Sequence, residues 1–162
     1  MARRSVFRVF ISTLRKQWKE ELPHIQPMKE SLGWIMSKAS TFHAGYSDKL
    51  GLHIFVNFQH SSKAWQVGQF TINLILSKEI GVPTGNGMFI PADGVSFTEG
   101  SYRLGHVLGK RFDKWWHLKH DDAQILGEEW RPSSYEDEVT VLKEAVADVT
   151  GDVCRALVML GL

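Results

Sequence analysis

The sequence predicts an α+β fold, in which a mostly antiparallel sheet of four to six strands is flanked by an N-terminal and a C-terminal helix. Two observations support this prediction. Residues 52–59 and 70–77 alternate bulky apolar with polar side chains, the period of two that is typical of strands. Both ends of the chain instead space their apolar residues by three and four, as amphipathic helices do. The 162 residues are expected to form one domain, residues 1–162.

The first helix is predicted from an apolar stripe that stops at a proline. The members of the stripe are Phe7, Ile11, Leu14, Trp18 and Leu22. Pro23 ends the helix, because a proline pushes the residue before it out of the helical region. A short helical turn is expected next, over residues 25–32.

The strands occupy the middle of the chain. A first strand is expected within residues 33–46, where Trp34, Met36 and Phe42 share one parity. The two central strands each direct four large apolar residues to one face: Leu52, Ile54, Val56 and Phe58, and then Phe70, Ile72, Leu74 and Leu76.

Two later stretches are less regular. Residues 81–100 are rich in Gly and Pro, and they form either short strands at Met88–Ile90 and Val95–Phe97 or a long functional loop. "KRFDKWWHLKH", residues 110–120, is expected to form a late strand or a short amphipathic piece.

The last helix is predicted over residues 134–160. Ser133 and Glu136 fit a capping box, and acidic residues in the first turn suit the positive end of the helix dipole. Gly151 is a weak point inside the helix, because Gly costs about 1 kcal/mol relative to Ala. The apolar residues step by threes and fours: Val139, Leu142, Val146, Val149, Val153, Leu157 and Leu160.

Three carboxamides lie on the polar face of the two central strands, where asparagine is usually rare. Asn57 and Gln59 belong to one strand and Asn73 to the other. They are candidate binding residues, because neighbouring amides can donate and accept hydrogen bonds in one connected network. Two alternatives stay open: a polar seam that fixes the strand register, and catalysis with His53 or His60.

Tryptophans supply further candidate binding residues. Trp115 and Trp116 are consecutive, so a strand turns one of them into the core and the other outward. Trp65, between the two central strands, is another candidate. An exposed Trp is a typical anchor of a protein interface, whereas packing under a terminal helix is the alternative.

The order of these motifs resembles bacterial domain-of-unknown-function family 4304. The resemblance covers about residues 5–160 and depends on "FVNFQHSS", "GQFTINLILS", "RLG" and "DKWWHL". The matching positions are Phe42, Asn57, Gln59, Ser61, Phe70, Thr71, Asn73, Arg103, Asp113, Trp115 and Trp116. It implies an α+β domain in a bacterium and adds Arg103 to the candidate binding residues. By analogy with small domains that neutralise toxins, it also suggests an immunity protein.

No catalytic motif is present, and neither a cofactor nor a metal is predicted. "GHVLGKR" has three residues between its glycines where a phosphate loop has four, and Ser or Thr is missing after Lys110. His117 and His120 would share a face only if their stretch were helical. Cys154 is the only cysteine, which predicts a reducing, cytoplasmic location. No apolar run reaches the length of a membrane helix.

The chain is therefore expected to be a non-enzymatic binding protein in a bacterium. It would bind a partner protein such as a toxin or effector, as an immunity-type inhibitor does. One alternative is a nucleic-acid-binding accessory protein, because residues 1–19 hold six basic residues and no acid. That alternative would use Arg8, Arg15 and Lys19. The other alternative is an enzyme that uses the amide and histidine face of the sheet.

Overall fold

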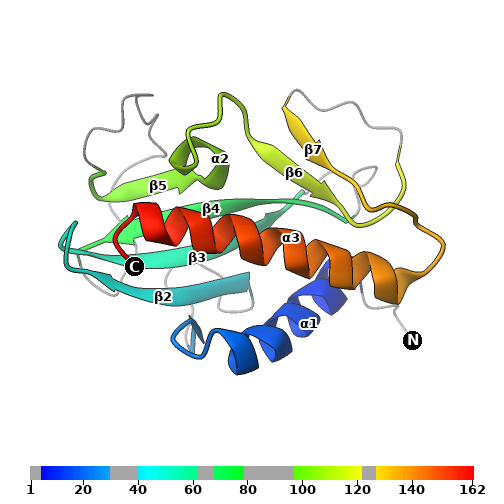
Figure 1. Cartoon of the computed structure of the whole chain (residues 1–162), viewed down its shortest axis with the longest axis horizontal. Helices are drawn as coiled ribbons and strands as arrows, with labels where there is room; N and C mark the ends of the chain where they lie inside the picture. The colour runs from blue at the N-terminus through cyan, green and yellow to red at the C-terminus, as the bar shows by residue number, and fades with distance from the viewer. Residues whose placement is uncertain (1–4, 30–39, 62–67, 79–96, 122–126) are drawn as a thin grey trace.

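The computed structural model describes residues 5–29, 40–61, 68–78, 97–121 and 127–162 (Figure 1). Within these ranges seven strands form one sheet in the order β1-β2-β3-β4-β6-β7, and β5 also pairs with β4. The strands are β1 (Gln26–Pro27), β2 (Thr41–Ser47), β3 (Leu52–His60), β4 (Gln69–Ser77), β5 (Gly100–Arg103), β6 (Lys114–His117) and β7 (Glu128–Trp130). The helices are α1 (Val6–Glu21), α2 (Leu104–Val107) and α3 (Glu138–Met159). The predicted α+β fold is confirmed, with one strand more than the expected range.

The centre of the sheet is the antiparallel pair β3 and β4, which matches the two strongest strand predictions. Asn57 lies opposite Asn73 in the register of this pair. The predicted side-chain parity is also confirmed, because all eight predicted apolar residues join one buried cluster. All described strand pairs are antiparallel except β6 with β7, which is parallel.

Both long helices cover the same face of the sheet, with α3 crossing over β3 and β4 and α1 beside it (Figure 1). The Trp18 indole N–H of α1 donates to Thr150 Oγ1 of α3 over 2.9 Å. The predicted stripe of α1 needs one correction, because Phe7 and Leu22 are only half-buried while Val6 and Phe10 are buried. The buried stripe of α1 is therefore turned slightly around the helix axis relative to the predicted one.

The predicted start of α3 is wrong. Asp137 is the N-cap residue, and its side chain accepts a hydrogen bond from the backbone N–H of Val139. Ser133 lies outside the helix and donates its hydroxyl to Glu144 instead. Val139, in the first turn of α3, is 60% exposed, whereas Val149 is fully buried. Gly151 lies within the continuous helix.

The helical turn predicted over residues 25–32 is wrong for its described part. Gln26 and Pro27 form β1 and pair with His43 and Phe42 of β2. A proline favours an extended conformation for the residue before it, which suits an edge strand. Residues 34 and 36 and the strand predicted at 88–90 lie outside the described residues. Phe97 is described and lies in no strand. No helix in the described ranges is both long and apolar enough to cross a bilayer.

Candidate functional site

The predicted carboxamides meet in one hydrogen-bonded network on the face of the sheet opposite α1 and α3. Asn73 Nδ2 donates to Asn57 Oδ1 over 3.2 Å and to Gln59 Oε1 over 3.0 Å. Asn57 Nδ2 in turn donates to Thr41 Oγ1 over 2.9 Å. The register of β2, β3 and β4 brings these side chains together, since they occupy one face at successive cross-strand positions.

Arg103 completes this network from β5. One guanidinium nitrogen, Nη1, donates to Gln59 Oε1 over 2.8 Å and to Asn73 Oδ1 over 2.7 Å. Its Nε forms an ion pair of 3.1 Å with Asp113, which follows α2. Asn57, Gln59, Asn73 and Arg103 thus already bond to one another. This arrangement supports the polar seam among the alternatives, and a binding or catalytic role for this face stays a prediction.

The predicted tryptophans are not part of the amide network. Trp116 is fully buried and stacks on Phe70, with ring centroids 5.4 Å apart. Trp115 is half-buried on the other side of β6. The alternation expected from consecutive residues is therefore present, although Trp115 is only partly exposed. Trp65 lies outside the described residues.

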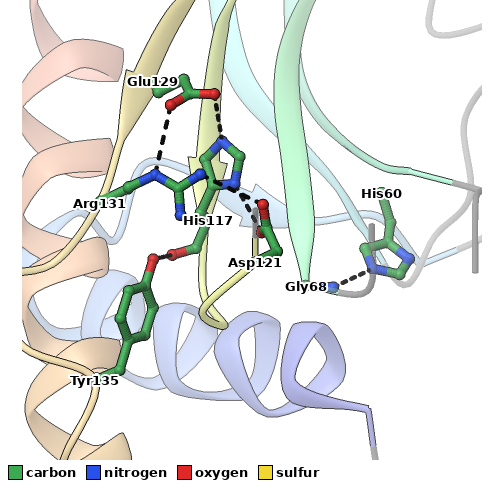
Figure 2. Close-up of polar contacts among 7 residues, drawn as sticks. All are labelled: His60, Gly68, His117, Asp121, Glu129, Arg131 and Tyr135. Carbon is green, nitrogen blue, oxygen red and sulfur yellow. Dashed lines mark hydrogen bonds and ion pairs between the residues drawn. The ribbon is translucent and has the colours of Figure 1, made fainter. Parts of the chain in front are cut away.

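A second polar cluster surrounds His117 at the end of β6 (Figure 2). Its side chain is fully buried, with Nδ1 2.9 Å from Asp121 Oδ2 and Nε2 3.7 Å from Glu129 Oε1. Arg131 lies 3.4 Å from both carboxylates, and the Tyr135 hydroxyl donates to the His117 carbonyl over 2.9 Å. Because a fully buried imidazole is out of reach of a substrate, we assign this cluster to holding β6, β7 and the start of α3 together.

Two histidines also pair on the face of the sheet opposite α1 and α3. His43 Nε2 and His53 Nδ1 are 3.1 Å apart, as expected for neighbours on β2 and β3. Burial, and then the nearby His53, lower the pKa of His43. His60 lies apart and accepts a hydrogen bond from the Gly68 N–H over 3.2 Å (Figure 2). In the described part of the chain, no group of three His, Cys, Asp or Glu residues could hold a metal ion.

A groove of about 710 Å³ lies between α2 and the C-terminal half of α3. Its described apolar walls are formed by Leu104, Leu108, Val158 and Met159. Val158 is 69% exposed and Met159 is 45% exposed. Gly105 also lines the groove, and it must be glycine, since a Cβ there would lie 2.7 Å from the Phe112 carbonyl oxygen. The chain after α2 can therefore approach this helix closely.

Charged residues form the floor and rim of this groove. Lys114 Nζ lies 2.8 Å from a carboxylate oxygen of both Asp148 and Asp152. Burial alone would lower the pKa of Lys114, but hydrogen bonds to the two carboxylates outweigh it and raise the pKa. Arg155 pairs with Asp152, yet 65% of the Arg155 side chain stays exposed. Lys110 lies exposed at the rim.

Sequence reasoning missed this groove, although part of the signal was present. Asp148, Asp152 and Arg155 follow the spacing i, i+4, i+7, which places three charges on one face of a helix. Their partner Lys114 lies on β6, 34 residues before Asp148. Only the folded chain shows that the two segments meet.

Arg8, Arg15 and Lys19, the residues of the predicted nucleic-acid face, all lie on α1. Arg8 and Lys19 are exposed, whereas Arg15 is half-buried. Their spacing of seven and four places them on one side of the helix. Nucleic-acid binding by this side stays a prediction.

Comparison with known proteins adds no relative, since the chain matches no family model, no curated protein and no solved structure. The resemblance to family 4304 therefore stays a prediction.

Proposed function

We propose that this chain is a non-enzymatic binding protein whose partner protein docks in the groove between α2 and α3. One observation carries the proposal: Val158 and Met159 expose apolar side chains on the wall of a groove that is open to solvent. Exposed apolar surface rimmed by charge is typical of a protein interface. The polar side chains of the amide network, by contrast, already bond to one another, which favours the groove over the amide face.

The chemistry of the partner follows from the charges at the rim. Lys110 and Arg155 offer two exposed cationic groups and Glu128 one exposed carboxylate, while Asp148 and Asp152 are already paired with Lys114. The exposed charge of the lining is therefore positive on balance. A partner segment with an apolar anchor and a neighbouring carboxylate would bury Val158 and pair with Arg155. An immunity-type inhibitor of a toxin is the kind of binding protein that the family resemblance favours.

The test compares two glutamate substitutions on the same helix. Val158→Glu places a charge on the groove wall, and Val139→Glu places it at the other, exposed end of α3. We expect a protein to copurify in equimolar amount from the source organism with the wild type and with Val139→Glu. We expect Val158→Glu to lose it, because a buried charge opposes docking. Retention of the partner by Val158→Glu would contradict the proposed interface.

The native cysteine gives a second readout. Cys154 lines the groove and is half-buried. Burial raises the pKa of its thiol, and the nearby charge of Arg155 lowers it by a smaller amount. As the only cysteine in the chain, it can be labelled alone. Addition of the purified partner should slow its reaction with a maleimide. The immunity role requires in addition that the partner is toxic when expressed alone and harmless with the wild type, but not with Val158→Glu.

A further inference from the structure

A second cavity, of about 550 Å³, lies at the C-terminal end of α1. Its described walls come from the last turns of α1, the segment that leads into β1, β1 itself and β2: Arg15, Lys16, Trp18, Lys19, Pro23, Ile25, Gln26, Pro27 and Phe42. None of them lines the groove of the proposed function. The volume falls within the range of small-molecule sites, about 300–1,000 Å³.

The floor of this cavity is apolar. Trp18, Ile25 and Phe42 are almost completely buried. The Trp18 and Phe42 rings meet edge to face, with centroids 5.0 Å apart. Because the Trp18 indole N–H already donates to Thr150, the ring offers the cavity only carbon surface. Since at most 2% of each of these residues is exposed, the apolar surface open to a ligand includes the exposed prolines of the lining, Pro23 and Pro27.

The rim of the cavity is cationic. Arg15, Lys16 and Lys19 line it, and none of the described lining residues is acidic. Glu21, in the last turn of α1, accepts a hydrogen bond from Gln17 and is not among the lining residues.

Arg15 also has an unmet hydrogen-bonding need. Its Nε is buried and has no hydrogen-bond partner within the described part of the chain. A buried donor without an acceptor is unfavourable, and an anionic oxygen is the strongest acceptor for a guanidinium N–H.

We propose that this cavity binds a small amphipathic carboxylate, with the apolar chain against Pro23 and Pro27 and the carboxylate at Arg15 and Lys19. The three cations select a negative head group, and the apolar lining selects an uncharged body. This inference is independent of the partner protein proposed for the groove.

The test uses three ligands with the same ten-carbon chain and different head groups: decanoate, decanol and decyltrimethylammonium. Calorimetric titration below the micelle concentration should give saturable binding of decanoate at a single site. Decanol should bind about tenfold more weakly, and the cation should not bind. Equal affinity for decanoate and decanol, or no saturable binding of decanoate, would overturn the proposal.

Two variants locate the site. Arg15→Gln should weaken decanoate binding about tenfold and leave decanol binding unchanged, because only the head group contacts the guanidinium. Arg8→Gln is the matched control, since Arg8 lies on the same side of α1 outside the cavity. The indole N–H resonance of Trp18 should shift with decanoate in the wild type and in Arg8→Gln. Equal weakening by both variants, or displacement of decanoate by a short DNA duplex, would indicate a diffuse basic surface and would overturn the proposal.

Discussion

Lys114 of β6 and Asp152 of α3 form an ion pair of 2.8 Å across the boundary between sheet and helix. Only 13% of the lysine side chain and 6% of the aspartate side chain are exposed. Asp148 accepts a hydrogen bond from the same ammonium group and another from the Trp116 indole N–H. The position of α3 on the sheet therefore depends on charge as well as on apolar packing.

Removal of the lysine should destabilise the fold strongly. Lys114→Met leaves Asp148 and the buried Asp152 close together without their shared cation, and we expect a loss of about 3 kcal/mol in the free energy of unfolding. Urea denaturation measures this loss. Lys143→Met, at an exposed position of α3, is the control and should change the stability little. Similar losses for both variants would contradict the role of the buried pair.

The same pair predicts a dependence on alkaline pH. The pKa of Lys114 in the folded state is raised above its usual value of 10.5. The pair therefore contributes its full stabilisation below pH 10.5 and loses it as the pH rises through the higher, folded-state pKa. Wild-type stability should fall over this range more steeply than that of Lys114→Met, as followed by thermal unfolding. Parallel curves would show that the ammonium group is not the cause.

His43 predicts a dependence on mildly acidic pH. Its pKa in the folded state is lowered from 6.5, first by burial and then by His53. The unfolded chain therefore binds a proton more readily, so stability should decrease as the pH falls below 6.5 toward the folded-state pKa. His43→Gln should make this decrease shallower, whereas His24→Gln, on an exposed residue, should not. The melting temperature across this range gives the comparison.

Two valines of α3 test the placement of the helix. Val149 is fully buried, and Val149→Ala should cost about 2 kcal/mol, because it removes apolar contacts and leaves a small cavity. Val139 is 60% exposed, and Val139→Ala should change the stability by less than about 0.5 kcal/mol. Chemical denaturation of both variants measures the difference. Equal costs would favour the longer apolar stripe that the sequence predicts.

Arg103 tests whether the amide network is a structural seam. Arg103→Met removes the donor shared by Gln59 and Asn73, and we expect a loss of about 1 kcal/mol, since 30% of the side chain is exposed to solvent. Arg103→Lys keeps a cation near Asp113 and should restore part of the stability. An unchanged stability for Arg103→Met would disfavour the seam and return the network to the candidate binding residues.

The parts of the fold that the sequence predicted correctly are those with a repeated local pattern. The alternation in β3 and β4 repeats over several residue pairs, and the apolar spacing in α1 repeats over several helical turns. A pattern repeated this often specifies which face is buried. The edge strands β1 and β7 have two and three residues, which is too short for any periodicity. The start of α3 was misplaced because Ser133 with Glu136 and Asp137 both offer capping chemistry, and the tertiary contact of Ser133 with Glu144 decides between them.

The candidate sites likewise include a part that the sequence predicts and a part that only the structure shows. Asn57, Gln59 and Asn73 could be grouped from the sequence, because the strand period places them on one face. The pairing of Arg103 with Asp113 and of Lys114 with Asp152 depends on how β5, α2 and α3 pack on the sheet. No local pattern encodes these contacts, and so the groove emerged only from the structure.

The two ends of the described strand order have a consequence for the protein at high concentration. Pro27 in β1 has no N–H to offer a further strand, and β7 carries the exposed Glu128. Short, charged or proline-containing borders discourage another copy from adding its own strand by backbone pairing. Self-assembly into fibrils through these borders should therefore be slow, even in concentrated samples.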